Sequence, residues 1–276
     1  MSLKHLTKDL TSYDLLKTFA VIFMLVDHVG YYFFDGNDWL RVAGRMCVPV
    51  WFFLIGYART RDLGPKLWIG AAILVAASSV VGLGVFPVNI LGTMIIIRLV
   101  IDPVMKRALM GPQAIWQISV MMILLSFPTS YMFEYGTLAV IMAMFGWLVR
   151  NQHEIPHGER LTQQYFFFSL ATFVIIQTMF FGFEQNEIPV LGGGILLVMC
   201  MLMFFRPLTL AGTGEGIKGV LLAPVRFMGR YTLEIYVAHL LLFKALGAMI
   251  DPERFSLFDW KLVPEGMLEM AVSGVN

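Results

Sequence analysis

The sequence predicts an all-α integral membrane protein: a polytopic bundle of about nine transmembrane helices that forms a single domain over residues 1–276. Of the 276 residues, 58% are hydrophobic and 14% are charged, and the mean hydropathy is +0.74. A soluble domain is about 25% charged and at most about half apolar. The apolar residues also cluster in windows of about 20, the length that an α-helix needs to cross a bilayer.

The candidate spans are joined by short polar connections, several of which contain Pro or Gly. We expect helices because lipid offers no hydrogen-bond partner to the backbone, so each segment must satisfy its own N–H and C=O groups. The sixth window is short, and residues 214–230 are compatible with a re-entrant or interfacial segment, so the total lies between eight and ten. The windows are 13–34, 42–59, 67–86, 88–105, 114–130, 135–149, 164–183, 188–205 and 231–250.

The distribution of Lys and Arg predicts a cytoplasmic N-terminus, because cytoplasmic connections carry an excess of these residues. In this orientation most basic residues lie at cytoplasmic helix ends. The opposite side keeps Arg41, Arg254 and Lys261, with Arg45 just inside the second span. Nine spans would place the C-terminus outside. The first apolar run lacks a small-residue cleavage site, so we expect a retained helix rather than a signal peptide.

Several classes of function are disfavoured by the composition. A formal net charge of +1 without a basic stripe argues against a nucleic-acid partner. Cys47 and Cys200 fall in apolar spans without metal-ligand spacing, so we expect packing residues and no disulfide. No zinc signature, Walker loop or nucleophile elbow is present in the sequence, and we predict no metal. The lipid bilayer is an expected partner, and an oligomer is compatible with the sequence.

The stretch "FMLVDHVGYYFF", residues 23–34, places Asp27 and His28 side by side in the first apolar span. An ionisable group within a span is costly and is a functional-site hypothesis by default. Lys17 precedes His28 by eleven residues, about three helical turns, so the two share a face. Histidine can act as a general base near neutral pH, and an adjacent carboxylate can orient it. The alternative is a polar face that only contacts a neighbouring helix; we favour catalytic roles for His28 and Asp27.

Charged residues in two further spans are expected to form pairs. Arg41 and Arg45 stand four residues apart at the outer edge of the second span. They can snorkel to lipid headgroups, or Arg45 can enter the bundle and pair with Asp27. In the fourth span Arg98 and Asp102 are also four apart, and we expect them to pair because an unpaired charge there would be costly.

The remaining candidates are polar residues at span ends and in the last span. Asn89 starts the fourth span, where it can cap the helix. In "MGRYTLEIYVAHLLLF", Tyr236 and His239 enter an apolar run, and a second membrane histidine favours a shared cavity. Basic residues at the inner helix ends either set the topology or bind a phosphate-rich cytosolic ligand. These are Arg59, Arg61, Lys66, Lys106 and Arg107.

The segments "YDLLKTFAVIFMLVDHVGYYFF" and "RVAGRMCVPVWFFLIGYARTRD" resemble the opening of the TraX-like F-pilin acetylation family. That family begins with a Lys-x(10)-Asp/His-bearing helix and a "GR…P…F" helix; the spacing here is Lys17-x(10)-His28. The final "GRYTLEIYVAHLLL" is similar to the helix that ends many transmembrane acyltransferases, a superfamily that includes the acyltransferase-3 proteins. These have Arg where Lys17 stands, so their residue roles carry over less directly. The motifs cover residues 13–62 and 229–242.

The resemblance implies a membrane acyltransferase of the bacterial inner membrane. It would move an acetyl or similar acyl group from cytosolic acetyl-CoA or another acyl-CoA to a hydroxyl or amine of an extracytoplasmic glycan or pilin-like protein. His28 would remove the acceptor proton during direct attack on the thioester, with Asp27 holding the imidazole or stabilising its cation. Arg45 or another polar group would stabilise the oxyanion or position the acceptor; an acyl-histidine is also compatible with the sequence. We expect acceptor-side roles for Arg41, Arg45, Asn89, Tyr236 and His239. Expected CoA ligands are Lys17, Arg59, Arg61, Lys66, Arg98, Lys106 and Arg107.

Two other classes of function compete with this interpretation. A proton-coupled membrane transporter would use buried Asp and His residues to relay protons. It predicts inverted repeats and interrupted helices in matching halves, and neither is evident in the sequence. A non-catalytic membrane scaffold would leave the polar face of the first span without a use.

Overall fold

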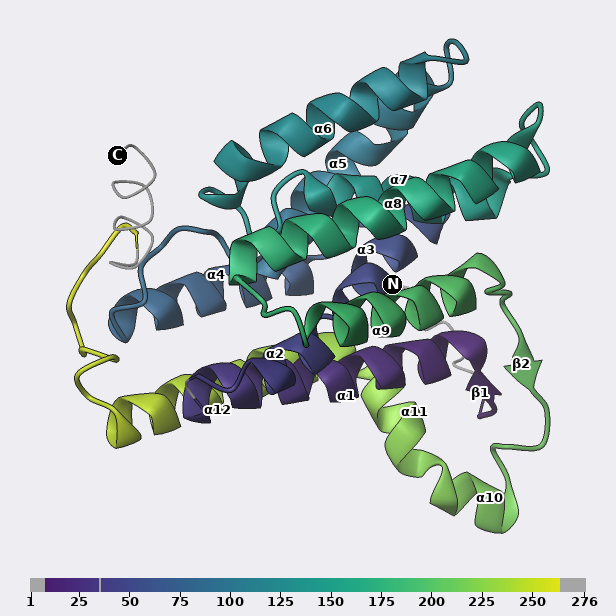
Figure 1. The fold of residues 1–276 in the computed structure, drawn as a ribbon. Helices are drawn as coiled ribbons and strands as arrows, with labels where there is room; N and C mark the ends of the chain where they lie inside the picture. The colour runs from purple at the N-terminus through teal and green to yellow at the C-terminus, as the bar shows by residue number, and fades with distance from the viewer. Residues whose placement is uncertain (1–7, 35, 264–276) are drawn as a thin grey trace.

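The structure, a computed structural model, describes residues 8–34 and 36–263, and its regular structure within these ranges is almost entirely helical (Figure 1). Two short strands, β1 (Leu10–Thr11) and β2 (Thr209–Leu210), pair antiparallel. The helices are α1 (Ser12–Phe33), α2 (Asp38–Gly44), α3 (Cys47–Tyr57), α4 (Pro65–Val80), α5 (Ile90–Ala108), α6 (Ala114–Ser130), α7 (Leu138–Asn151), α8 (Gly158–Phe181), α9 (Ile188–Met203), α10 (Gly216–Leu221), α11 (Ala223–Arg230) and α12 (Thr232–Ile250).

Each predicted span coincides with a helix or, for the second span, with the consecutive helices α2 and α3. Within residues 8–34 and 36–263, four segments are long and apolar enough to cross a membrane, namely α1, α2–α3, α8 and α12. The apolar helices α4, α6, α7 and α9 are shorter, and α5 carries charges in its second half. The all-helical class and the membrane character are therefore confirmed for the described residues, whereas the count of nine spans stays a prediction.

Residues 214–230 fold mainly as the short helices α10 and α11. The sequence was compatible with a re-entrant or an interfacial segment here. These helices project from the bundle beside the start of α1 (Figure 1). Ile217 and Val220 are 80% and 74% exposed, while Arg226 turns back and donates to the Lys8 carbonyl at 2.7 Å. An exposed apolar face with basic side chains beside it is the pattern of an interfacial segment.

The start of α1 is fixed by a reciprocal capping arrangement. Thr11 Oγ1 accepts a hydrogen bond from the Asp14 N–H at 3.2 Å, and Asp14 Oδ2 accepts from the Thr11 N–H at 3.0 Å. Such a capping box satisfies two of the backbone donors that a helix N-terminus leaves free. Asp14 is thus used in capping, although its side chain lies near the helix face that carries Lys17.

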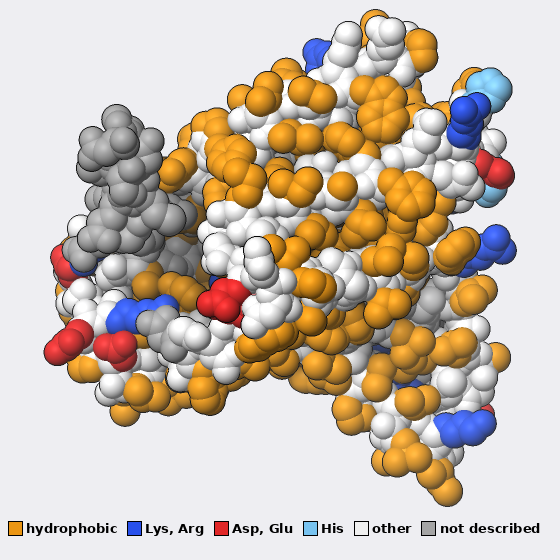
Figure 2. All heavy atoms as spheres, viewed as in Figure 1, with side chains coloured by type: hydrophobic (Ala, Val, Ile, Leu, Met, Phe, Trp, Pro, Cys, Tyr) orange, Lys and Arg blue, Asp and Glu red, His pale blue; other side chains and the backbone are white. Residues whose placement is uncertain are grey.

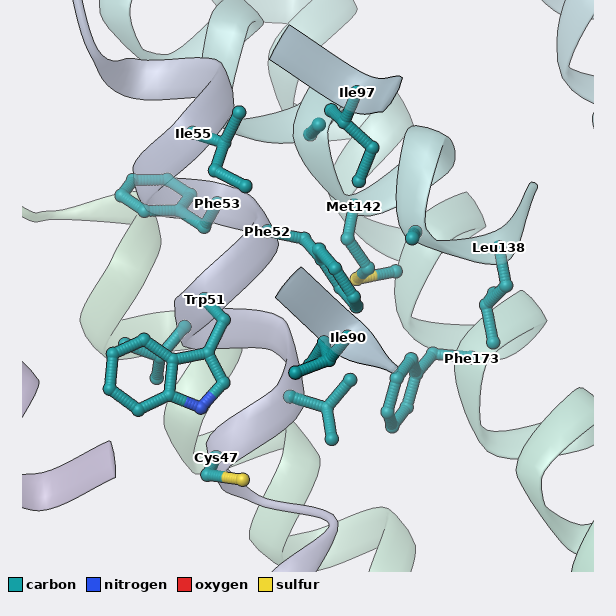
Figure 3. Packing of buried hydrophobic residues seen from close by; sticks show 14 of the residues in the cluster. Cys47, Trp51, Phe52, Phe53, Ile55, Ile90, Ile97, Leu138, Met142 and Phe173 are labelled. Carbon is teal, nitrogen blue, oxygen red and sulfur yellow. The ribbon is translucent and has the colours of Figure 1, made fainter. Parts of the chain in front are cut away.

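Helix α3 occupies the centre of the bundle, with α1, α2 and α12 on one side and α5 to α8 on the other (Figure 1). Its residues Phe52 and Phe53 are fully buried. Figure 3 shows Phe52 directed at Met142 of α7, whereas Trp51 points away from this contact. The helix is therefore apolar on all sides, as expected for a buried core helix.

Two glycines allow α3 and α7 to approach each other closely. A Cβ added at Gly56 would lie 1.8 Å from the Ala143 carbonyl oxygen, and one added at Gly146 would lie 2.2 Å from the Phe53 carbonyl oxygen. Small residues have this role in membrane bundles, where backbone contact and van der Waals packing drive helix association.

Hydrophobic side chains cover the middle of the face shown in Figure 2, and the charged side chains visible there lie mainly toward its two ends. Large apolar residues are strongly exposed, with Leu124 at 70% and Leu197 at 74%. A large continuous apolar surface is unusual for a soluble monomer. It agrees with contact between this face and lipid.

We predict that Gly56→Ala destabilises the protein, because its methyl group would overlap a backbone carbonyl of α7. Overpacking of this kind costs on the order of 1–3 kcal/mol. Gly192→Ala is the matched control, since nothing lies within 4 Å of a Cβ at this position of α9, and alanine favours a helix. Thermal unfolding in detergent should show a lower midpoint for Gly56→Ala only; equal midpoints would contradict the packing argument.

Candidate functional site

A cavity of about 490 Å³ lies between α1, α3, α5 and α12. Lys17 and His28 both line it, and a rise of 1.5 Å per residue separates them by roughly 16 Å along α1. We call the two ends of the cavity the basic end and the histidine end. The basic end is lined by Tyr13, Lys17, Ala58, Asp62, Gly64, Lys66 and Arg98, and the histidine end by Asp27, His28, Cys47, Ile90, Glu134, Tyr135 and Tyr236.

The walls between the two ends are apolar. They include Met24 of α1, Trp51 and Leu54 of α3, Met94 of α5 and Leu233 of α12. Apolar walls with a few polar groups at defined points are typical of small-molecule sites. The cavity therefore suits an elongated ligand with a charged head and an uncharged arm.

Asp27, which is 6% exposed, joins two arginines at the histidine end. Arg45 Nη2 lies 2.5 Å from Asp27 Oδ1, and Arg41 Nη1 lies 3.0 Å from Asp27 Oδ2. The predicted pairing of Arg45 with Asp27 is confirmed, and Arg41 joins the same carboxylate. Both carboxylate oxygens of Asp27 are engaged by guanidinium groups, and within the described residues no hydrogen bond joins Asp27 to His28. A role of Asp27 toward the His28 imidazole stays a prediction.

The local sequence explains why Arg45 reaches Asp27. Pro49 has no N–H to bond the Arg45 carbonyl four residues earlier, and its ring would clash with that carbonyl in a continuous helix. The chain accordingly breaks between α2 and α3 at Arg45 and Met46. Gly44 permits the contact with α1, since a Cβ there would lie 2.2 Å from the Asp27 Cβ. The "GR" pair and the following proline are therefore explained together: all three residues are needed to bring Arg45 to Asp27.

Aromatic rings surround the two guanidinium groups. The Arg45 guanidinium carbon lies 4.4 Å from the Phe181 ring centroid, and its Nη1 donates to the Tyr135 hydroxyl at 2.8 Å. Arg41 lies over the rings of Tyr31 and Phe181, at 5.3 and 5.4 Å. Cation–π contacts of this type are worth more in a desolvated site than at a surface. The Arg45 side chain is therefore packed between helices inside the bundle, and it does not line the cavity.

His28 contacts the second membrane histidine directly. Its Nδ1 lies 2.7 Å from Nε2 of His239, and the two rings are stacked with centroids 5.0 Å apart. His239 Nδ1 lies 2.7 Å from the Ile235 carbonyl oxygen, one turn earlier in α12. The Tyr236 ring is 6.0 Å from the His28 ring. The structure thus brings Tyr236 and His239 to His28 across the interface between α1 and α12.

The cations of the basic end have few protein partners. Lys17 makes no hydrogen bond or ion pair with any residue that the structure describes, and Arg98 donates to the backbone oxygen of Asp62. The predicted pairing of Arg98 with Asp102 is wrong. Asp102 is held by Arg61, through an Nη2–Oδ1 contact of 2.8 Å and an Nε–Oδ2 contact of 3.0 Å. A two-point guanidinium–carboxylate contact is favoured over a single helical i,i+4 contact.

The other basic candidates differ in their access to the cavity. Lys66 lines the basic end and bonds Glu234 at 2.7 Å, with both side chains largely exposed. Arg61 also donates to the Ile55 carbonyl at the end of α3, at 2.7 Å. The structure places the remaining basic candidates outside the cavity wall, as exposed residues. These are Arg59, Lys106 and Arg107.

Asn89 has a structural role at the start of α5. Its Oδ1 accepts from the Leu91 N–H at 3.1 Å, so the predicted cap is confirmed, and its Nδ2 donates to the Ala71 carbonyl at 3.0 Å. The side chain is 9% exposed and does not line the cavity.

Two cavity residues, Glu134 and Tyr135, were missed by sequence reasoning. They lie in the non-helical connection between α6 and α7, which is held beside the start of α5. The Val88 N–H donates to the Met132 carbonyl at 2.8 Å, and the Glu134 N–H donates to the Val88 carbonyl at 3.0 Å. A glutamate two residues before a glycine, in "FEYG" just before an apolar run, was the available signal.

A family model described as TraX protein matches residues 12–247. The chain belongs to the TraX family. The match runs from the first residue of α1 into α12, so it includes all four helices that form the cavity. A segment of 44 residues is 48% identical to uncharacterized protein RP591 of Rickettsia prowazekii (strain Madrid E); it covers 16% of this chain and 18% of that protein. No solved structure matches the chain.

We predict that Asp27→Asn lowers the free energy of unfolding by about 3 kcal/mol, because it leaves the buried Arg45 and the half-buried Arg41 without a countercharge. Asp259→Asn makes the same chemical change at an exposed pair with Lys261 and should lower the free energy of unfolding much less, because solvent screens an exposed ion pair. Denaturant unfolding of both variants in detergent measures the difference. Equal losses would show that the buried cluster contributes no more than a surface pair.

Proposed function

We propose that this TraX-family protein is a membrane acyltransferase. It moves an acetyl or similar acyl group from acyl-CoA on the cytosolic side to a hydroxyl or amine on the opposite side. The observation that carries the proposal is the cavity that joins the cations of the basic end to His28. The family name, associated with F-pilin acetylation, supports it. A relationship to the acyltransferase-3 proteins belongs to the same proposal. The acceptor class that we propose is a pilin-like protein or an envelope glycan.

The chemistry of acyl-CoA matches the order of groups along the cavity. Phosphates favour Lys and Arg through charge-assisted hydrogen bonds. Lys17 and Arg98 stand at the basic end, and within the described residues no ion pair joins either of them to a carboxylate. The long, narrow pantetheine arm would follow the apolar walls. Its thioester would then lie near His28, where a base is needed.

His28 acts as the general base in the reaction that we propose. It takes the proton from the acceptor hydroxyl or amine while the acceptor oxygen or nitrogen attacks the thioester carbonyl carbon. The C–S bond then breaks, and the departing thiolate takes the proton back from the imidazolium, which yields free CoA thiol and the acylated acceptor. The hydroxyls of Tyr135 and Tyr236 are the candidates to stabilise the oxyanion, since they line the cavity and Arg45 does not.

The orientation belongs to the same proposal. A cytoplasmic N-terminus in the bacterial inner membrane would place the basic end toward the cytosol, where acyl-CoA is made. The excess of Lys and Arg at this end supports it. The acceptor would approach the histidine end from the other side, near the junction of α1 and α2.

We predict that His28→Ala lowers acyl transfer by about 10² or more, the usual contribution of a positioned acid–base group, while acetyl-CoA binding is retained. Turnover is measured as release of free CoA thiol by purified protein with an envelope extract as acceptor. His153→Ala is the matched control, because His153 is 71% exposed beside Glu159 and far from the cavity wall. Near-normal turnover of folded His28→Ala would refute the proposed base.

We further predict that Lys17→Met and Arg98→Met each raise the KM for acetyl-CoA by about tenfold, with less effect on kcat. The loss of one charge-assisted hydrogen bond, at about 1.4 kcal/mol, corresponds to that factor. Lys106→Met removes an exposed cation that does not line the cavity, and its KM should stay unchanged. An equal rise in all three variants would indicate general electrostatic attraction instead of docking at the basic end.

A further inference from the structure

We infer that His239 is a positioning residue that fixes the tautomer of His28 and leaves Nε2 of His28 as the nitrogen that receives the acceptor proton. This inference deepens the proposed function and rests on it. It assigns to a neutral imidazole the orienting role that a carboxylate has in catalytic triads.

The tautomer of His239 is set by its hydrogen bond to the backbone of α12. Its Nδ1 lies 2.7 Å from the Ile235 carbonyl oxygen. A carbonyl oxygen can only accept a hydrogen bond, so Nδ1 of His239 carries the hydrogen. In a neutral imidazole with hydrogen on Nδ1, the other nitrogen is an acceptor. Nε2 of His239 therefore presents a lone pair.

The tautomer of His239 determines the tautomer of His28. Nε2 of His239 lies 2.7 Å from Nδ1 of His28, so the hydrogen between the two rings belongs to His28. Nε2 of His28 is then the unprotonated nitrogen. Within the part of the chain that the structure describes, it has no hydrogen-bond partner. The hydrogen bonds run in one direction, from His28 through His239 to the backbone of α12.

The ring of His239 is held in a fixed position by its neighbours. The side chain is 8% exposed, and its ring lies 5.7 Å from the Tyr236 ring and 5.4 Å from the Phe243 ring. Packing on both sides holds the ring in the plane that its two hydrogen bonds require. Asp27 cannot replace it, because its carboxylate is engaged by Arg41 and Arg45.

The arrangement has a consequence for the proton transfer. When Nε2 of His28 takes the acceptor proton, the existing Nδ1–H···Nε2 bond to His239 becomes charge-assisted and therefore stronger. The interaction thus stabilises the imidazolium more than the neutral ring. A second proton on His239 would reverse the direction of the bond and place hydrogen on Nε2 of His28, which abolishes the base.

The direct test is nitrogen NMR of ¹⁵N-histidine-labelled protein in lipid nanodiscs without substrate, with His28 assigned from the signals lost in His28→Ala. The expected result is hydrogen on Nδ1 of His28 in the wild type and in His239→Gln, whose amide oxygen can accept. In His239→Leu the Nδ1–H form should lose its preference. Hydrogen on Nε2 of His28 in the wild type would overturn the inference, even if the leucine variant fails to fold.

Turnover of acetyl-CoA by the His239 variants provides a second, independent test. His239→Leu should lower kcat by about 10²-fold, the scale of a mispositioned base, with an unchanged KM for acetyl-CoA, and His239→Gln should restore most of the activity. Equal loss in both variants would indicate a packing role and overturn the inference. If the tautomer is as expected but the wild type transfers no acyl group from acetyl-CoA, the positioning holds and the proposed function fails.

Discussion

The ion cluster of Asp27 with Arg41 and Arg45 determines how the site is built. Charges in a low-dielectric bundle are tolerated only when they are paired, so the second span must bring its arginines to α1. Gly44 allows the contact and Pro49 breaks the helix beside it, and the chain then enters the bundle centre as α3. The same contact fixes the residue after Asp27, which is His28, at one end of the cavity.

Along the cavity, two kinds of chemistry are kept apart by roughly 16 Å of apolar wall. Three cations, of which Lys66 is paired with Glu234, stand at one end, and a pair of stacked histidines stands at the other. A soluble transferase would have no need for this separation, because donor and acceptor share one solvent. In the proposed reaction the donor is acyl-CoA, which does not cross bilayers unaided; a bundle with this arrangement would let its thioester approach His28 while the nucleotide stays at the surface.

The features predictable from the sequence are those that depend on local composition. Apolar windows of about 20 residues located the helices, and the cost of an unpaired membrane charge linked Arg45 to Asp27. Contacts set by distant segments were not predictable. Arg61 displaces Arg98 from Asp102 because the connection between α3 and α4 lies beside α5. His28 and His239 are 211 residues apart in the chain, so their hydrogen bond requires the packing of α1 on α12, and Glu134 reaches the cavity only through the contact of its connection with the start of α5.

The most direct test of the account is photolabelling with an acetyl-CoA analogue that carries a diazirine in its acyl group, followed by peptide mass spectrometry. The account predicts labels on the residues around His28, such as Met24, Ile90 and Tyr236, competed by unlabelled acetyl-CoA and weakened in Lys17→Met. Labels confined to the α4–α5 or α8–α9 connections, or labels that acetyl-CoA does not compete, would contradict the claim that the cavity carries the thioester to His28.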